Sequence, residues 1–198
     1  MSHKKEAMIA YLKKDLENAH DIDAKKLANH IRTVGFECRK CANCCMSEFG
    51  DNTVIVSPSQ IKLICDRYGL MHDDFVIPMP SQDRDENGNI HTFEWRLKRN
   101  GECIFLKEKM CEIYECRPFI CRTYPFYLLD GKLVVCECMG IGGIISDIDS
   151  NELAGILKER YVREIKESIA LFEKFNGFNP RGHGNLCVHD SEGEHWIE

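Results

Sequence analysis

Apolar residues recur at helical spacing between Met8 and Val34. They fall at intervals of three or four positions, which is the repeat of a helix that buries one face. Asp21 or Asp23 is placed to cap a second helix, and Gly35 follows the last apolar position. The pattern therefore predicts two helices, or one bent helix, ending near Gly35.

A short strand and a helix are predicted next. The β-branched run at residues 53–56 favours a strand. Ser57 is placed as the N-cap of a helix, Pro58 as its first residue and Gln60 as the partner in a capping box. Cys65 falls on the apolar face of this helix, so it is expected to pack in the core rather than to bind metal.

An alternation of apolar and polar side chains at residues 91–99 predicts a half-buried strand. The Asn87-Gly88 pair ahead of it favours a tight turn. Residues 101–106 follow a second such turn and are expected to form the hairpin partner of this strand. Cys103 is therefore expected on a small antiparallel sheet.

The C-terminal part of the chain begins with a strongly periodic stretch. Residues 152–175 predict an amphipathic helix, with Asp149 or Ser150 as its cap and Gly177 as its stop. The last twenty residues, 179–198, show no periodicity. They are expected to form a tail or a meandering surface segment.

These elements predict an α+β protein with flanking helices, a small antiparallel hairpin and cysteine-rich loops. At 198 residues and 22.9 kDa, the chain suits a single small domain. Along the sequence, residues 1–35 form an N-terminal helical segment, residues 36–145 a cysteine-rich core, and residues 146–198 a C-terminal helix and tail.

The net charge of −6 argues against non-specific binding to nucleic acid, because the chain has no surplus of basic groups to neutralise phosphates. No stretch approaches the ~20 apolar residues that span a bilayer, and the N-terminal segment lacks the apolar core of a secretion signal. We therefore expect no membrane partner and a location in the cytoplasm.

Twelve cysteines are far more than a chain of this length ordinarily carries. Their even number permits disulfides, but a reducing cytoplasm and a chain this long weigh against a disulfide scaffold. Metal ligation is the favoured interpretation.

Four of these cysteines stand close together at Cys38, Cys41, Cys44 and Cys45. The first three have the C-x2-C-x2-C spacing of a bacterial ferredoxin run, in which tight turns direct several thiolates at one centre. Glu48 occupies the position where the fourth ferredoxin cysteine would stand. The run therefore needs ligands from elsewhere in the chain.

Candidates for those ligands lie in the second cysteine-rich region. They are Cys103, Cys111, Cys121 and Cys138, with Cys116 and Cys136 as further thiols nearby. Eight thiolates make two four-coordinate sites, or one site and one cluster. If Cys44 and Cys45 face opposite ways, each serves a different centre. Zinc and iron-sulfur centres both accept four thiolates, and the irregular spacing with an adjacent pair favours iron-sulfur over zinc.

Other residues near the thiols carry a structural and a functional interpretation. Arg117 and Arg122 are placed to offset thiolate charge or to pair with surface carboxylates. The aromatic residues around them are expected to fill the core: Tyr114, Phe119, Tyr124 and Phe126. The glycines of the following stretch are expected to form a tight turn packed against the metal site: Gly140, Gly142 and Gly143.

The remaining thiols and histidines are weaker candidates. Cys116, Cys136 and Cys187 are interpreted as packed side chains, although Cys136 alternates with Cys138 on a predicted strand at residues 132–138. The three histidines of the tail are expected to be exposed to solvent rather than to bind metal: His183, His189 and His195.

The arrangement resembles the CxxCxxCC cysteine-cluster family of zinc- or iron-chelating proteins, which includes the YkgJ-type proteins. The resemblance rests on the run CRKCANCC, on CIFL at 103–106, on CEIYECRPFICRTYPF at 111–126 and on CMGIGG at 138–143. It marks the same eight cysteines as metal ligands: Cys38, Cys41, Cys44, Cys45, Cys103, Cys111, Cys121 and Cys138.

The resemblance implies an iron-sulfur cluster, of the 4Fe–4S type, or zinc. The family also includes flagellin lysine N-methylases, so an alternative function is methyl transfer from S-adenosylmethionine to a protein lysine. No binding site for that cofactor is evident in the sequence, and the catalytic residues stay unassigned. Two further alternatives are a metal chaperone and a structural zinc protein that binds a partner protein.

Overall fold

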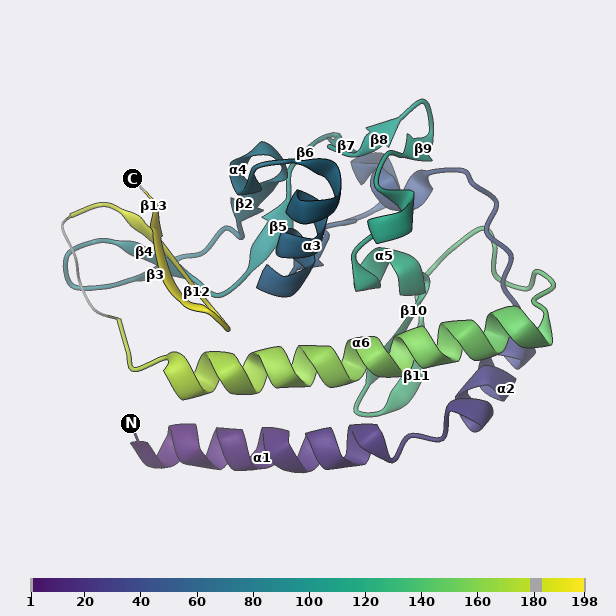
Figure 1. The fold of residues 1–198 in the computed structure, drawn as a ribbon, viewed down its shortest axis with the longest axis horizontal. Helices are drawn as coiled ribbons and strands as arrows, with labels where there is room; N and C mark the ends of the chain where they lie inside the picture. Colours follow the sequence, from purple (N-terminus) through teal and green to yellow (C-terminus); the bar gives the residue numbers. More distant parts are fainter. Residues whose placement is uncertain (1, 179–182, 198) are drawn as a thin grey trace.

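A computed structural model describes residues 2–178 and 183–197 and confirms the α+β class (Figure 1). The α-helices are α1 (Ser2–His20), α2 (Ala24–Val34), α3 (Pro58–Tyr68), α4 (His72–Phe75), α5 (Phe119–Thr123) and α6 (Asp147–Lys174). Short 3-10 helices are η1 (Asn43–Cys45), η2 (Ser47–Phe49) and η3 (Tyr114–Cys116).

The strands are short and belong to several small sheets. They are β1 (Ile55–Val56), β2 (Val76–Pro78), β3 (Asp83–Arg84), β4 (Ile90–Thr92), β5 (Trp95–Leu97), β6 (Arg99–Asn100), β7 (Glu102–Cys103), β8 (Leu106–Lys107), β9 (Met110–Cys111), β10 (Phe126–Leu129), β11 (Lys132–Val135), β12 (Leu186–Asp190) and β13 (Gly193–Ile197). The larger sheets have the strand orders β1-β5-β2 and β13-β12-β4-β3, and three two-stranded hairpins join β6 to β7, β8 to β9 and β10 to β11.

The predicted helix starts near the N-terminus are confirmed. The Asp23 carboxylate accepts hydrogen bonds from the backbone N–H groups of Lys25 and Lys26, at 2.9 and 3.1 Å, and so caps α2. Gly35 ends that helix with a positive φ of 72°. The helix α3 begins at Pro58, as predicted, and the Gln60 side chain accepts from the Ser57 backbone N–H at 3.3 Å.

The long helix α6 begins earlier than the sequence pattern predicts. Its cap is Ser146, whose hydroxyl accepts from the backbone N–H of Asp149 at 3.0 Å. The predicted caps, Asp149 and Ser150, lie inside the first turns, where Ser150 is fully buried. The prediction was wrong because the apolar periodicity starts only after a polar first turn.

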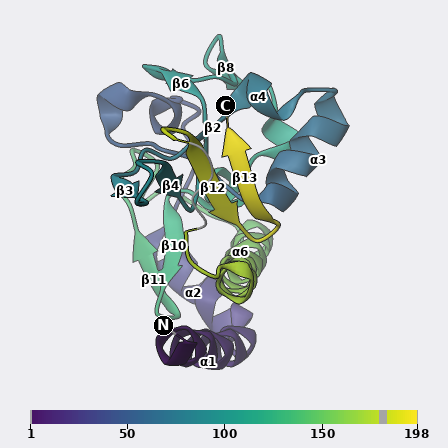
Figure 2. The same ribbon diagram turned by 90° about the vertical axis from the view of Figure 1, so that its left-hand side faces the viewer.

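One hydrophobic core forms where α6 packs against α1, α2 and the β10-β11 hairpin. Figure 2 shows α1 running beneath α6, with the hairpin beside them. The buried members of this core are Ala19, Leu27, Ala28, Ile31, Phe126, Leu128, Ala154, Leu157, Tyr161, Ile165 and Ile169.

A second hydrophobic core lies around α3 and the sheet β1-β5-β2. Its buried members are Val56, Ile61, Ile64, Phe75, Val76, Trp95, Leu97, Phe105, Ile113 and Val188. Cys65 is partly buried against this core, as predicted.

The single strand predicted at residues 91–99 is instead two strands in different sheets. The chain breaks at residues 93–94, so that β4 pairs with β3 and β12, whereas β5 pairs with β1 and β2. The segment 101–106 does not pair with β5. It turns at Gly101, and Arg99 pairs with Cys103 in a hairpin of two-residue strands, which confirms Cys103 on a small antiparallel sheet.

The predicted C-terminal tail is wrong for its described part, residues 183–197, because that part contains a β-hairpin. Strand β12 pairs antiparallel with β13 and parallel with β4. Parallel pairing across such a long stretch of chain has no local signature in sequence. The predicted strand at 132–138 also ends early, at Val135, so that Cys136 and Cys138 lie beyond β11.

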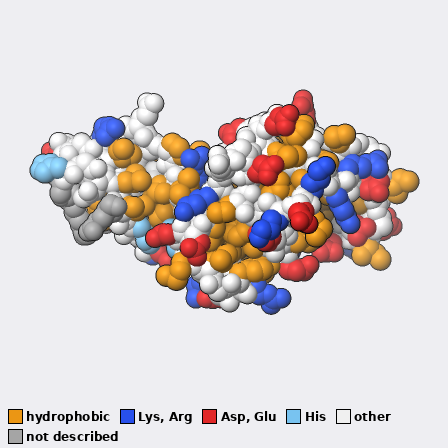
Figure 3. All heavy atoms as spheres, turned by 90° about the horizontal axis from the view of Figure 1, so that it is seen from above, with side chains coloured by type: hydrophobic (Ala, Val, Ile, Leu, Met, Phe, Trp, Pro, Cys, Tyr) orange, Lys and Arg blue, Asp and Glu red, His pale blue; other side chains and the backbone are white. Residues whose placement is uncertain are grey.

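In the described part of the chain, no helix combines the length and apolar character needed to span a membrane. On the face of the molecule shown in Figure 3, acidic and basic side chains are interspersed among hydrophobic ones rather than gathered into a basic stripe.

The glycine-rich stretch after Cys138 packs directly against the backbone that precedes the cysteine run. Glu37 donates its backbone N–H to the Gly140 carbonyl at 2.9 Å, and Gly142 donates to the Gly35 carbonyl at 3.0 Å. A Cβ on Gly140 would lie 2.3 Å from the Glu37 carbonyl oxygen, and one on Gly143 would lie 2.8 Å from the Glu37 nitrogen. Gly140 and Gly143 are therefore packed backbone against backbone, whereas Gly142 has open space at its Cβ position and a positive φ of 80°.

We expect Gly140→Ala to lower the free energy of unfolding by about 1–3 kcal/mol, because the new methyl group forces two backbone segments apart. Urea unfolding followed by circular dichroism measures this. Gly155→Ala is the matched control: it lies within α6 with open space at its Cβ position, so alanine should stabilise by about 0.5–1 kcal/mol. Equal stability of Gly140→Ala and the wild type would contradict the packing.

Candidate metal centre

The eight cysteines singled out from the sequence come from several separate elements. Cys38 and Cys41 lie in the irregular segment after α2, Cys44 and Cys45 in η1, Cys103 on β7, Cys111 on β9, Cys121 in α5 and Cys138 after β11. None of the twelve cysteines, all of which lie in the described part of the chain, takes part in a disulfide. The elements that carry them are short, so their positions depend on contacts between segments rather than on one rigid element.

Backbone contacts at both ends of the cysteine run bring it to the other segments. At its start, the bond between Glu37 and Gly140 places Cys38 close to the segment of Cys138. At its end, the Ser47 backbone N–H donates to the Gly101 carbonyl at 2.8 Å, next to the β6-β7 hairpin that carries Cys103. The run thus bridges the two regions that supply the other cysteines.

Within the run, Cys44 and Cys45 share a hydrogen bond, with their sulfurs 4.0 Å apart. This bond lowers the pKa of Cys44 to about 7, against the opposing effect of burial, and the nearby Arg117 lowers it further. The same bond, together with burial and the Cys44 charge, raises the pKa of Cys45. The favoured arrangement is therefore a Cys44 thiolate that accepts a hydrogen bond from the Cys45 thiol.

A first group of thiols is formed by Cys45 with the three cysteines of β7, β9 and α5. Burial and then repulsion from the thiolates of Cys103, Cys44 and Cys111 raise the pKa of Cys121. Burial raises the pKa of Cys103 and of Cys111 as well, with further repulsion from Cys44. Cys103 and Cys121 in turn add to the raised pKa of Cys45. Ionisation of one of these thiols thus disfavours ionisation of the others.

A second group is formed by Cys138 with the start of the run. Burial raises the pKa of Cys138, and repulsion from Cys41, Cys38 and Cys44 adds to the effect. The Gly140 backbone N–H donates to the Cys138 sulfur at 3.4 Å, which favours its thiolate form.

Tyr124 lies beside this second group. Burial, followed by the charges of Cys138, Cys44, Cys136 and Cys41, raises the pKa of Tyr124 to about 12. Its hydroxyl therefore stays protonated and donates a hydrogen bond to the Glu137 carbonyl.

Arg117 lies among the first group of thiols. Its charge lowers the pKa of Cys44, Cys111 and Cys121 alike. The guanidinium carbon stands 3.6 Å from the centre of the Tyr114 ring, and Nε donates to the Tyr114 carbonyl at 3.1 Å. Arg117 thus supplies positive charge to the thiols while the ring holds it in place.

Arg122 lies elsewhere, with its guanidinium 5.3 Å from the ring of Phe119. Of the four aromatic residues expected in the core, Phe126 is fully buried, Phe119 and Tyr124 are half-buried, and Tyr114 is exposed. The core interpretation is therefore wrong for Tyr114, whose ring covers Arg117 instead.

The thiols outside the set of eight are placed differently. Cys116 lies in η3, close enough to Tyr68 to raise the pKa of that phenol after burial, and Cys136 is exposed. Cys187 is fully buried, as its interpretation as a packed side chain implies.

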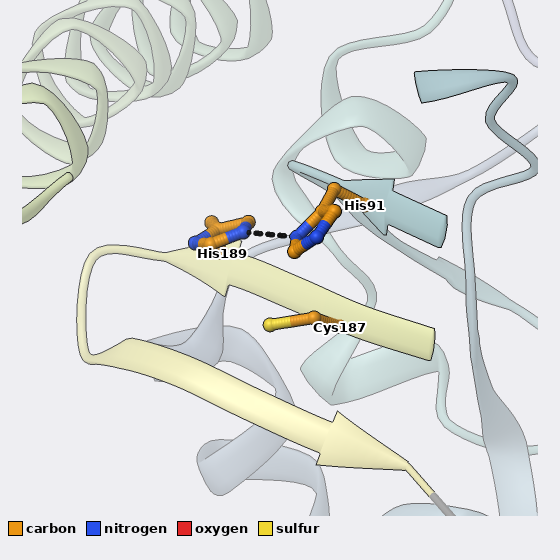
Figure 4. Close-up of side chains that lie close together, drawn as sticks. All are labelled: His91, Cys187 and His189. Atoms are coloured by element: carbon orange, nitrogen blue, oxygen red, sulfur yellow. Dashed lines mark hydrogen bonds between the residues drawn. The ribbon is translucent and has the colours of Figure 1, made fainter. Parts of the chain in front are cut away.

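A second constellation, not recognised from the sequence, surrounds Cys187. Histidine, cysteine, aspartate and glutamate side chains can bind metal. Among the described residues, one set of three such side chains has donor atoms that all lie within 4.8 Å of one another: His91, Cys187 and His189 (Figure 4). His189 was expected at the surface but is 2% exposed. His183 is exposed and His195 half-buried, where it bonds to the Asp190 carboxylate at 2.9 Å.

A signal for this trio was present in the sequence. Cys187 and His189 alternate in LCVHD, so a strand there places both on one face. The sequence shows no periodicity that predicts a strand in this segment. His91 lies 96 positions before Cys187 in the chain, so the proximity of these two residues depends on the β4-β12 pairing.

Comparison with known proteins gives one curated relative and one family. An uncharacterized protein of Methanocaldococcus jannaschii, MJ0661, is 29% identical over 110 residues, which cover 54% of this chain and 54% of the relative. The chain thus spans about half the length of the curated relative that it matches. No solved structure matches the chain.

The family model described as "Putative zinc- or iron-chelating domain" matches residues 37–139, a stretch that begins just before Cys38 and ends just after Cys138. This stretch is just over half of the chain, and the protein belongs to the CxxCxxCC family of zinc- or iron-chelating domains.

Proposed function

We propose that this protein holds metal through eight cysteine thiolates, and that the metal includes an iron-sulfur cluster of the 4Fe–4S type. The proposed ligands are Cys38, Cys41, Cys44, Cys45, Cys103, Cys111, Cys121 and Cys138. The observation that carries the proposal is the convergence of cysteines from separate segments of the chain, so that the charge of one thiol affects the pKa of the others.

Burial, followed by the charges of neighbouring thiols, raises the pKa of several of these cysteines, and Arg99 and Arg117 offset this only in part. Thiols with raised pKa values stay protonated near neutral pH unless a cation takes the place of the protons. A metal centre binds thiolates in their deprotonated form and so supplies that cation. The donor set, all sulfur, suits zinc and iron-sulfur clusters and does not suit magnesium or calcium.

We propose two centres of four thiolates each, because Cys45 and Cys138 are affected by different thiols: Cys45 by Cys103 and Cys121, and Cys138 by Cys38 and Cys41. Cys44 affects thiols of both sets, and its assignment to the second centre is part of the proposal. The first centre takes Cys45 with the three thiols of β7, β9 and α5: Cys103, Cys111 and Cys121. The second takes Cys138 with three thiols of the run: Cys38, Cys41 and Cys44. The adjacent pair Cys44 and Cys45 then belongs to both centres, one residue to each.

The irregular spacing of the eight cysteines along the chain, with the adjacent pair Cys44 and Cys45, favours a cluster over a single zinc ion. Zinc is the alternative.

A reducing compartment suits this function, since the ligands must stay thiolates. The cytoplasm meets that requirement. Metal binding would also contribute to folding, because strands of two residues carry Cys103 and Cys111 and give them little support of their own.

Anaerobic purification should give a coloured protein with a broad sulfur-to-iron absorption band and with matching amounts of iron and acid-labile sulfide. The bonds between thiolate and iron cause this absorption. A colourless protein that contains zinc alone would contradict the iron-sulfur cluster and support zinc as the bound metal.

Single substitutions separate the two proposed centres. Cys45→Ser should remove the metal of the first centre and spare the second, whereas Cys38→Ser should do the reverse, because each removes one of four ligands. Metal analysis together with the absorption or paramagnetic resonance spectrum measures this. Cys116→Ser is the matched control, since this thiol lies near the first group but outside the set of eight. Loss of all metal in either variant would instead indicate one shared centre.

Removal of the metal with a chelator should make the cysteine-bearing segments lose ordered structure. Removal of metal takes away the bonds that would tie these segments together, so hydrogen exchange at residues 38–49 and 99–121 should accelerate by at least tenfold. Exchange in α6 should change little, because its hydrophobic core is separate. Identical exchange with and without metal in the cysteine segments would count against the proposal.

The methylase alternative makes a different prediction. A methyltransferase carrying the cluster should bind S-adenosylmethionine saturably as holo-protein, with a protein lysine as substrate. Calorimetric titration of the metal-loaded protein tests this, and a flat titration would exclude it. A metal chaperone predicts exchangeable metal instead, and a structural zinc protein predicts tightly held zinc and a partner protein.

A further inference from the structure

The β4-β12 pairing brings two histidines and a cysteine onto one face of the four-stranded sheet. In this parallel pair, Cys187 stands opposite His91. His189 follows Cys187 by two positions on the same strand, so its side chain points to the same side. Figure 4 shows the three side chains converging from β4 and β12.

The donor atoms of this trio are close enough to share one ion. The His91 Nδ1 and His189 Nε2 atoms are 2.8 Å apart, and a nitrogen of each ring lies within 4.8 Å of the Cys187 sulfur. Two imidazoles and one thiolate are ligands that zinc commonly takes, at about 2.0–2.1 Å for nitrogen and 2.3 Å for sulfur. A tetrahedral ion would replace the contact between the two rings and hold the nitrogens about 3.3 Å apart.

A buried carboxylate orients the His91 ring. Asp85 lies 3.2 Å from His91 Nε2, and both side chains are almost wholly buried. The same carboxylate accepts from the backbone N–H groups of Asn87 and Asn89 and from the Asn89 side-chain amide. An acceptor with these partners takes the hydrogen of His91 Nε2, which leaves the Nδ1 lone pair directed at His189 and Cys187.

This carboxylate-histidine arrangement is the one that commonly supports a metal ligand. It also balances charge. A divalent ion with one thiolate and two neutral imidazoles carries a single positive charge, and the Asp85 carboxylate offsets it within a dry environment.

Aromatic rings cover the trio. The Phe178 ring stacks on His91 at 4.0 Å between centroids, Phe93 stacks on His189 at 5.3 Å, and Phe175 meets His189 edge-on at 5.1 Å. His91 and Cys187 are fully buried. A cavity of about 20 Å³ borders His189 at the end of α6, which is room for one water molecule.

We infer that His91, Cys187 and His189 form a separate binding site for one zinc-like divalent ion, distinct from the eight-cysteine centres. Three protein ligands leave one position for water. On binding, the ion replaces the thiol proton of Cys187, which leaves to solvent. The hydrogen of His189 moves from Nε2 to Nδ1, so that both facing nitrogens offer lone pairs.

Zinc content per chain tests this site in the full-length protein. We expect Cys187→Ala and His189→Gln each to hold one zinc ion fewer than the wild type, as counted by mass spectrometry of the metal. Their iron and acid-labile sulfide should stay unchanged. Two controls should keep the wild-type zinc: Cys65→Ala, which removes another partly buried thiol, and Val188→Ala, which perturbs the same strand on its opposite face. Equal zinc in the wild type and both site variants would overturn the site.

A measurement on the wild type covers the case in which the variants fail to fold. The zinc-edge X-ray absorption spectrum should contain imidazole nitrogen scattering beside sulfur. A zinc shell made of sulfur alone, or an absence of zinc after loading with Zn²⁺, would overturn the site. Iron and sulfide are measured separately, so failure of the cysteine centres and failure of this site give different results.

Discussion

The convergence of cysteines from separate segments is the constraint on which the middle of this structure depends. The cysteine run sits between two hydrophobic cores: Phe36, at its start, packs against the core around α6, whereas Cys103 and Cys111 pack against the core around α3. The segments between have few long strands or helices of their own. A metal held as proposed would therefore also join the two hydrophobic cores.

Local sequence signals predicted the helices well because each depends on neighbouring residues. Asp23 caps α2 and Gly35 ends it, and both effects are confined to one helix turn. The start of α6 was missed because Ser146 precedes a polar turn that has no apolar periodicity. The α+β class and the CxxCxxCC family were likewise predicted from the sequence, since they depend on local patterns and short motifs.

Features that depend on pairing between strands far apart in the chain could not be predicted from the sequence. Nothing near residue 187 indicates that β12 pairs with β4, so the C-terminal hairpin and the burial of His189 were both missed. The break between β4 and β5 was missed for the same reason, since the alternation continues through it while the partners change. As β12 lies outside residues 37–139, the family-matched segment is completed by a strand from beyond its boundary.

The contact between Glu37 and Gly140 has a consequence for the order of events during synthesis. It joins positions 103 residues apart, and closing a flexible loop of that length costs about 4 kcal/mol in chain entropy. A nascent chain exposes Cys38, Cys41 and Cys44 long before Cys138 has been made. Cys138 joins them only after the intervening segment has collapsed, so a centre of the proposed composition would be filled late. Until then, the early thiols depend on a reducing environment to remain unoxidised.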